Sequence, residues 1–150
     1  MLYFAYGSNM CRDGMRRRCP EAEALGVASL RSHAFMIMAN GYASVVPATA
    51  QAVRGILWRI SPRDLATLDA YEDVAGGLYR RATMPVSRAG ASMPALVYLG
   101  AERRHGMPRP GYMESVLAAA RQWALPDDYA TALSRFGRAN SASAARGRDV

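Results

Sequence analysis

The chain has 150 residues, of which 51% are hydrophobic and 21% are charged, a composition typical of one soluble globular domain. Its net charge of +7 comes from 19 basic residues, all of them arginine, against 12 acidic residues. The absence of lysine excludes a Schiff-base lysine, a P-loop lysine and a Ser–Lys dyad. No apolar run approaches the roughly 20 residues that span a bilayer, so we expect no membrane segment.

The few metal-binding and thiol residues indicate neither a metal site nor a disulfide framework. Cys11, Cys19, His33 and His105 form no ligand spacing that would hold a metal ion. The opening MLYFAYGSNM lacks the positive leader of a signal peptide, so we expect free thiols and a cytoplasmic location. The arginines are scattered outside any RNA- or DNA-binding pattern, and nucleic acid is therefore not favoured as a partner.

The first elements in chain order are a strand, a tight turn and a helix. The strand is Leu2–Tyr6, an apolar and aromatic run. Ser8 and Asn9 are good N-cap residues for a helix over Met10–Arg18, which ends before Pro20. The arginine run that closes this helix is interpreted as a solvated helix end.

The middle of the chain predicts several short strands. Val53–Ile60 is the clearest of them, because its residues alternate with a period of two. Gly55 within it indicates a bulge or a close backbone approach, and Pro47 is predicted to interrupt the strand before it. The other strand segments in this region are Val27–Leu30, Ala34–Met38 and Tyr42–Val46.

A helix is predicted from the Ser61 cap to about Tyr71, because Pro62 follows the cap and Asp64 lies in the first turn. The remaining predicted elements are strands Leu78–Val86 and Ala95–Leu99, a loop over Ala101–Pro110, a helix over Gly111–Leu125 and a short helix from Pro126 to Phe136. We expect one domain over residues 1–136 and a mobile or disordered tail over residues 137–150. About six strands and four helices without regular βαβ alternation favour an α+β fold with a barrel-like mixed sheet and peripheral helices.

The turn after the first strand is one candidate binding site. A strand that turns into a helix N-terminus presents free backbone N–H groups, and these hold carboxylates or phosphates. Gly7 allows a ligand to approach the backbone closely. The alternative, an ordinary capped turn, stays open because a single glycine is not a nucleotide-binding fingerprint.

Glu72 is the candidate general base. Leu65 and Leu68 define the apolar face of the helix before it, and helical periodicity places Glu72 within roughly 10° of the middle of that face. A carboxylate that faces the core is desolvated, which raises its pKa toward neutrality. The alternative is a frayed helix end with Glu72 in water. Several tyrosines at strand ends are read either as core residues or as the lining of a polar pocket.

These segments resemble the γ-glutamylcyclotransferase family, also called the AIG2-like group. The resemblance rests on YFAYGSNM, on LDAYED followed by GGLYRR, and on the late strand ALVYL, and it covers about residues 2–136. It implies a small mixed β-barrel flanked by helices, with Glu72 as the catalytic glutamate. The residues that it implies for substrate binding are Tyr3, Phe4, Ala5, Tyr6, Gly7, Ser8, Asn9, Tyr79, Tyr98 and Tyr112. The family commonly has glycine after the glutamate, where this chain has Asp73.

The resemblance implies a small γ-glutamyl substrate that closes on itself to 5-oxoproline and releases an amine, with no metal or other cofactor. Some members form dimers, so a homodimer is an open expectation. A general γ-glutamyl amino acid cyclotransferase and a pathway-specific enzyme that deprotects a γ-glutamyl amine both fit, and we expect the Ala101–Pro110 loop to distinguish them. A non-catalytic binding module on the same fold is the third alternative.

Overall fold

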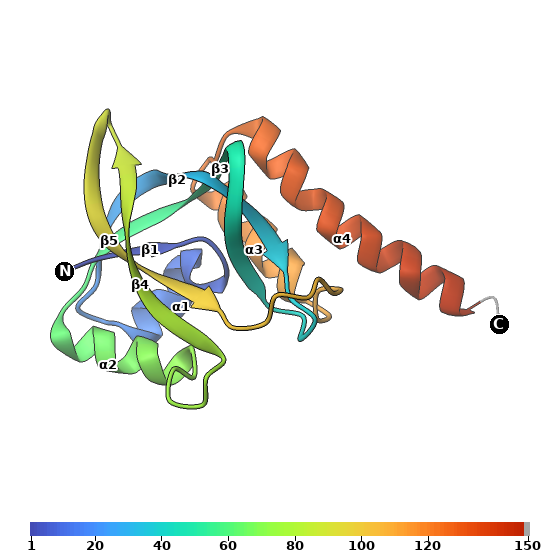
Figure 1. Ribbon diagram of the computed structural model, residues 1–150, viewed down its shortest axis with the longest axis horizontal. Coiled ribbons are helices and arrows are strands. Elements are labelled where there is room, and N and C mark those ends of the chain that lie inside the picture. Colours follow the sequence, from blue (N-terminus) through green and yellow to red (C-terminus); the bar gives the residue numbers. More distant parts are fainter. Residues whose placement is uncertain (149–150) are drawn as a thin grey trace.

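A closed β-barrel with helices on its outside forms the body of the computed structural model, which describes the backbone of residues 1–148 and the side chains of residues 1–137 (Figure 1). The strands in these residues are β1 (Leu2–Ala5), β2 (Glu23–Ile37), β3 (Ala43–Arg59), β4 (Tyr79–Arg88) and β5 (Ala91–Gly100). They pair in the order β1-β3-β2-β4-β5. β1 is parallel to β5 and the other pairs are antiparallel, so the predicted mixed barrel is confirmed.

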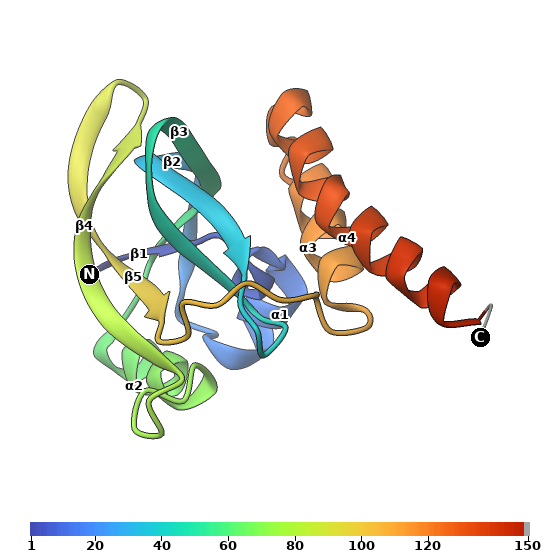
Figure 2. The same cartoon turned by 45° about the vertical axis from the view of Figure 1, so that its right-hand side comes forward.

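The helices lie on two sides of the barrel, with α2 on one side and α3 and α4 on another (Figure 2). Their bounds are η1 (Ser8–Met10, a short 3₁₀ helix), α1 (Arg12–Arg18), α2 (Pro62–Tyr71), α3 (Tyr112–Gln122) and α4 (Asp127–Arg148). None of the described helices combines the length and the apolar character that crossing a bilayer requires. The predicted helix over Met10–Arg18 is in fact two segments, because Cys11 has an extended backbone and caps α1 with its sulfur.

The barrel has five strands where about six were predicted, because β2 and β3 each join two predicted segments. Pro47 does not interrupt β3. It lies opposite His33, where the register shifts between Arg31 and His33. A proline cannot donate to a strand ladder, and such an irregularity is where a sheet tolerates it. The long pairing of β2 with β3 therefore continues across a bulge.

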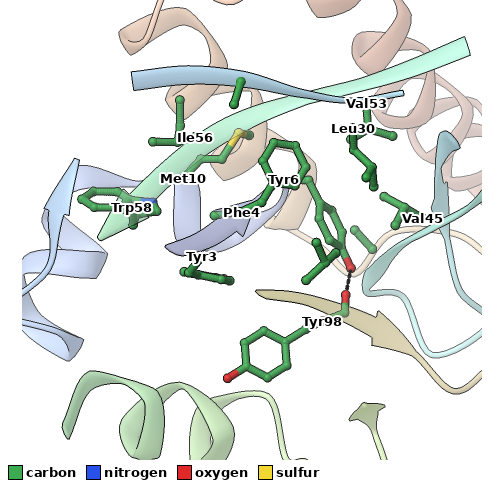
Figure 3. Packing of buried hydrophobic residues seen from close by; sticks show 14 of the residues in the cluster. Tyr3, Phe4, Tyr6, Met10, Leu30, Val45, Val53, Ile56, Trp58 and Tyr98 are labelled. Carbon is green, nitrogen blue, oxygen red and sulfur yellow. Dashed lines mark hydrogen bonds between the residues drawn. The ribbon is translucent and has the colours of Figure 1, made fainter. Parts of the chain in front are cut away.

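Large apolar side chains of β1 and β3 fill the barrel interior (Figure 3). Phe4, Ile56 and Leu57 are fully buried. Gly55 confirms the predicted close approach, since a Cβ there would lie 2.9 Å from the Phe4 ring and would meet the carbonyl oxygen of Ala5. This contact holds β1 tightly on β3, so that the turn after β1 leaves the barrel at a defined place.

Helix α4 does not end at Phe136 but continues to Arg148. Its continuation has no proline and is rich in alanine and arginine, which are both strong helix formers. The prediction of a mobile or disordered tail over residues 137–150 stays a prediction, because side chains after residue 137 and the last two residues lie outside the described part of the chain.

Candidate active site

The turn after β1 depends on a glycine that leaves room for a tyrosine. At Gly7 a Cβ would lie 2.8 Å from the hydroxyl oxygen of Tyr112, a residue of α3. The chain then forms η1, in which the backbone N–H of Met10 donates to the Gly7 carbonyl at 3.1 Å. Trp123 anchors this segment, since its indole N–H donates to the Met10 carbonyl at 2.7 Å. The turn is a three-residue 3₁₀ segment separate from α1, and not the first turn of a longer helix.

Seven elements contribute residues to the wall of a cavity of about 220 Å³ here. Its lining residues are Tyr3, Phe4, Tyr6, Gly7, Ser8, Asn9, Tyr42, Ala43, Tyr71, Glu72, Leu78, Tyr79, Tyr98 and Tyr112. Every predicted site residue is among them except Ala5, which is buried in the barrel. No residue of the Ala101–Pro110 loop is among these lining residues, and the expectation that this loop distinguishes leaving groups stays a prediction.

Glu72 reaches the cavity from the C-terminal end of α2. The helix begins with a capping box, in which Ser61 and Asp64 exchange hydrogen bonds of 3.1 Å, and Leu68 anchors its inner face in the core. Glu72 is the C-cap, and its side chain is half-buried at the cavity wall. Burial raises its pKa from the ordinary 4.5 to about 7, and the positive charge of Arg18 acts against that rise. A carboxyl group in this range exchanges protons readily at neutral pH.

Asn9 connects Glu72 to two neighbouring side chains. Its amide nitrogen Nδ2 donates to Glu72 Oε1 at 3.2 Å and to the Tyr3 hydroxyl at 3.0 Å. Its oxygen Oδ1 accepts from Arg18 Nη2 at 2.5 Å and from Arg18 Nε at 3.1 Å. The Asn9 side chain is buried, and these four bonds use its whole hydrogen-bonding capacity.

Three tyrosine hydroxyls of the cavity wall donate to partners within the protein. Tyr6 donates to the Tyr98 carbonyl at 2.6 Å, a bond drawn in Figure 3. Tyr79 donates to the Ala43 carbonyl at 2.5 Å, and Tyr98 donates to Asp69 at 2.7 Å. Burial raises the pKa of each of these hydroxyls well above its usual value. They therefore remain protonated at neutral pH and supply fixed dipoles, which leaves Glu72 as the group that titrates.

Several residues of this region were not predicted. Tyr42, Ala43, Tyr71 and Leu78 line the cavity, and Tyr71 lies next to Glu72 in the sequence. Arg18 was interpreted as part of a solvated helix end, but it turns inward to Asn9. The signal was Gly14, four residues earlier on α1. A Cβ at this position would lie 2.9 Å from the Arg18 guanidinium, so the glycine opens the path along which the side chain folds back.

The backbone conformation of Asp73 shows how an aspartate can stand where the family commonly has glycine. Its φ is 50°, in the left-handed region that glycine adopts most readily and that aspartate tolerates better than most residues. Its carboxylate accepts the Gly76 N–H at 3.1 Å, within the loop that follows α2. Burial raises the pKa of Glu72, and Asp73 is not among the charges that shift it.

No three His, Cys, Asp or Glu side chains gather closely enough to hold a metal ion in the described part of the chain. The polar groups around the cavity are one carboxyl, one amide, hydroxyls and backbone N–H groups. This set can hold a small polar molecule and move a proton.

Comparison with known proteins agrees with the fold. Mouse gamma-glutamylcyclotransferase is 28% identical over 139 residues, which cover 85% of this chain and 74% of the mouse protein. The human gamma-glutamylcyclotransferase is 27% identical over the same shares of both chains. A solved gamma-glutamyl cyclotransferase structure superposes with a TM-score of 0.83 at 26% identity, over 89% of this chain and 86% of that one. The model of the AIG2-like family matches residues 52–133, more than half of the chain, and the chain therefore belongs to the AIG2-like family.

Proposed function

We propose that this protein is a γ-glutamylcyclotransferase. It would convert a γ-glutamyl amino acid or amine into 5-oxoproline and release the free amine. The observation that carries the proposal is the position of Glu72, a carboxyl with a pKa of about 7 on the wall of the cavity that Gly7 and Ser8 also line. The relatives named gamma-glutamylcyclotransferase support the same reaction.

The reaction needs a general base and a substrate that is held in the conformation from which it cyclises. The substrate's α-amino group arrives mostly as ammonium, and Glu72 accepts a proton from it. The freed nitrogen attacks the substrate's own γ-carbonyl carbon, and a C–N bond forms that closes the five-membered ring. Glu72 then returns its proton to the leaving nitrogen as the original amide C–N bond breaks. The ring nitrogen also gives up its second proton, and the released amine takes it up as ammonium. Two protons thus pass from the attacking to the leaving nitrogen, so atoms and charge balance without a co-reactant.

The rest of the cavity holds the substrate in its cyclising conformation. Backbone N–H groups at Gly7 and Ser8 would bind the α-carboxylate or polarise the γ-carbonyl. The rings of Tyr3, Tyr6 and Tyr98 would hold the carbon chain folded, since bringing the reacting atoms together supplies a large part of the rate of an intramolecular reaction.

The direct test is Glu72→Gln assayed for release of 5-oxoproline. Removal of the general base should lower kcat by about 10²–10⁴-fold. In the wild-type chain kcat/KM should rise as the pH increases through about 7, because the ionised Glu72 is the active form. Glu114→Gln makes the same chemical change at an exposed position of α3 and should leave turnover unchanged. Normal turnover by Glu72→Gln would remove Glu72 from the mechanism.

The nature of the leaving amine belongs to the same proposal. A panel of γ-glutamyl amino acids and γ-glutamyl amines would separate a general cyclotransferase from a pathway-specific deprotecting enzyme. Lactam formation from neither group, together with a salt-dependent affinity for nucleic acid, would favour the binding module instead. A cytoplasmic location, a homodimer and independence of cofactors stay predictions.

A further inference from the structure

Arg18 contacts the candidate base only through another side chain. Its guanidinium donates two N–H bonds to Asn9 Oδ1, and Asn9 Nδ2 donates in turn to Glu72 Oε1. Among the described residues there is no ion pair between Arg18 and Glu72. An arginine in direct contact with a carboxylate holds it ionised and lowers its pKa strongly. Here the intervening amide leaves Glu72 able to accept and return a proton.

Arg18 also determines which end of the Asn9 amide faces Glu72. A guanidinium only donates hydrogen bonds, so the amide must turn its oxygen toward Arg18. The Asn9 nitrogen then faces Glu72 and Tyr3 and can only donate to them. Without Arg18, the amide could rotate and present its oxygen to the carboxylate, which favours the protonated acid and leaves Oε1 without its donor.

Two features of the chain hold the guanidinium in this place. It lies over the ring of Tyr71, with Cζ 4.1 Å from the ring centre. It also occupies space left by Gly14, which is buried within α1 although glycine weakens a helix. The two preceding arginines of the run are exposed, and only Arg18 turns inward.

We propose that Arg18 is a positioning residue for the reaction: through Asn9 it holds Glu72 Oε1 and leaves the other carboxylate oxygen to exchange the proton with the substrate. This proposal rests on the proposed function of Glu72. Asn9 then acts as a fixed hydrogen-bond donor to Glu72. This role accounts for an arginine that forms no ion pair among the described residues.

Charged and titratable groups from each packed element face Glu72. They are Arg18 from α1, Tyr3 from β1, Tyr6 from the turn after β1, Tyr79 from β4, Tyr98 from β5 and Tyr112 from α3. Burial keeps the tyrosines protonated at neutral pH, so Arg18 is the fixed charge among these groups. Loss of its charge should raise the pKa of Glu72 further and move the rise of activity to higher pH.

The test compares Arg18→Met with Arg17→Met, its matched control on the exposed side of α1. Arg18→Met should lower kcat at least about tenfold, change KM less than about threefold, and move the acid limb of the pH–rate profile to higher pH. Arg18→Lys keeps the charge but cannot form the paired N–H bonds, so the acid limb should stay near its wild-type position while kcat falls. Arg17→Met should match the wild type in all three quantities.

Gly14→Ala provides a second variant that does not remove the arginine. Alanine favours a helix more than glycine does, but its Cβ would displace the guanidinium. We expect a chain at least as stable as the wild type, with a lower kcat. A ¹³C titration of the Glu72 carboxyl gives a readout without turnover, and its pKa should rise in Arg18→Met.

Wild-type kcat in both Arg18→Met and Gly14→Ala would overturn the positioning role. A loss of kcat in Arg18→Met with an unmoved acid limb and an unmoved carboxyl titration would also overturn it, because a structural defect alone gives that result. Glu72→Gln is measured in the same assay. If it is inactive while Arg18→Met is fully active, only this inference fails, whereas unaffected turnover in Glu72→Gln refutes the proposed function itself.

Discussion

Helix α2 has a carboxylate at each of its ends, and the two carboxylates lie in different environments. Asp64 lies in the first turn, almost fully buried, and accepts the backbone N–H of Ser61 at 3.1 Å. Glu72 lies at the C-cap, half-buried, and accepts a single bond from Asn9. The N-terminal end of a helix stabilises a negative charge, while the C-terminal end disfavours it. The same kind of group therefore caps the helix at one end and lines the cavity at the other.

Asp69, only three residues before Glu72, sharpens the contrast. It forms a paired interaction with Arg81, and Tyr98 donates to it at 2.7 Å. These bonds, those from Arg81 above all, hold the pKa of Asp69 below its usual value despite some burial, whereas burial raises the pKa of Glu72. Carboxyl groups whose pKa values are driven apart in this way take different parts in a site. Hydrogen bonds from Arg81 and Tyr98 favour the ionised form of Asp69, whereas burial favours the protonated form of Glu72.

The largest expected effect on stability comes from Glu72→Gln. The pKa of Glu72 is about 7 in the folded chain and 4.5 ordinarily, so between these pH values the folded state holds a proton that the unfolded state has lost. The free energy of unfolding of the wild type therefore falls as the pH rises through this window. Glutamine is neutral at every pH, so burying it carries no cost of burying a charge. The variant should therefore be more stable than the wild type by about 3 kcal/mol at pH 8 and close to it at pH 4.

Urea denaturation of both chains at the two pH values measures this difference. A gain in stability at pH 8 that accompanies the loss of turnover would show that the site stores an unfavourable interaction for its chemistry. An equal stability of the two chains at pH 8 would show that Glu72 is hydrated, and the contrast between the two ends of α2 would be lost.

The next largest effect on stability is expected from a substitution at the N-terminal end of α2. Asp64→Ala removes half of the capping box and leaves the Ser61 N–H without its acceptor. The chain should lose about 1–2 kcal/mol of stability, while kcat and KM stay at wild-type values, since Asp64 does not line the cavity. Denaturation and the 5-oxoproline assay on one preparation check both statements. A large loss of kcat in a folded Asp64→Ala chain would show that the two ends of α2 are coupled.

The contrast within α2 also marks what the sequence could predict. The cap at Ser61, the proline after it and the spacing of Leu65 and Leu68 are local signals, and they predicted the start of the helix and the direction of Glu72 correctly. Tyr79 and Tyr98 were placed at the cavity through the family resemblance. In each case the residue's neighbours in the sequence, or a known motif, carried the information.

The rest depends on contacts between distant parts of the chain. The pairing of Asp69 with Arg81 joins α2 to β4, and the bond between Arg18 and Asn9 requires the chain to turn back after η1. Neither contact has a periodicity that a sequence pattern could show. The same holds for Pro47, whose strand continues because β2 supplies a bulged partner. Long-range pairing thus decided the strand count and the electrostatics of the site.

The smallest effect expected is that of Asp69→Asn. Asparagine still accepts the Tyr98 hydroxyl, so the change removes mainly the charge that pairs with Arg81. Because the Arg81 side chain is about half exposed, at 49%, the loss should stay below about 1 kcal/mol. The pKa of Asp69 is lowered on folding, so its contribution is present above pH 3.8 and lost as the pH falls through the lower folded value. The stability difference between the chains should therefore vanish in acid, as it does for Glu72→Gln, but with the opposite sign at neutral pH, because Asp69→Asn lowers the stability that Glu72→Gln raises. A difference that grows with falling pH would contradict the opposed environments of these two carboxylates.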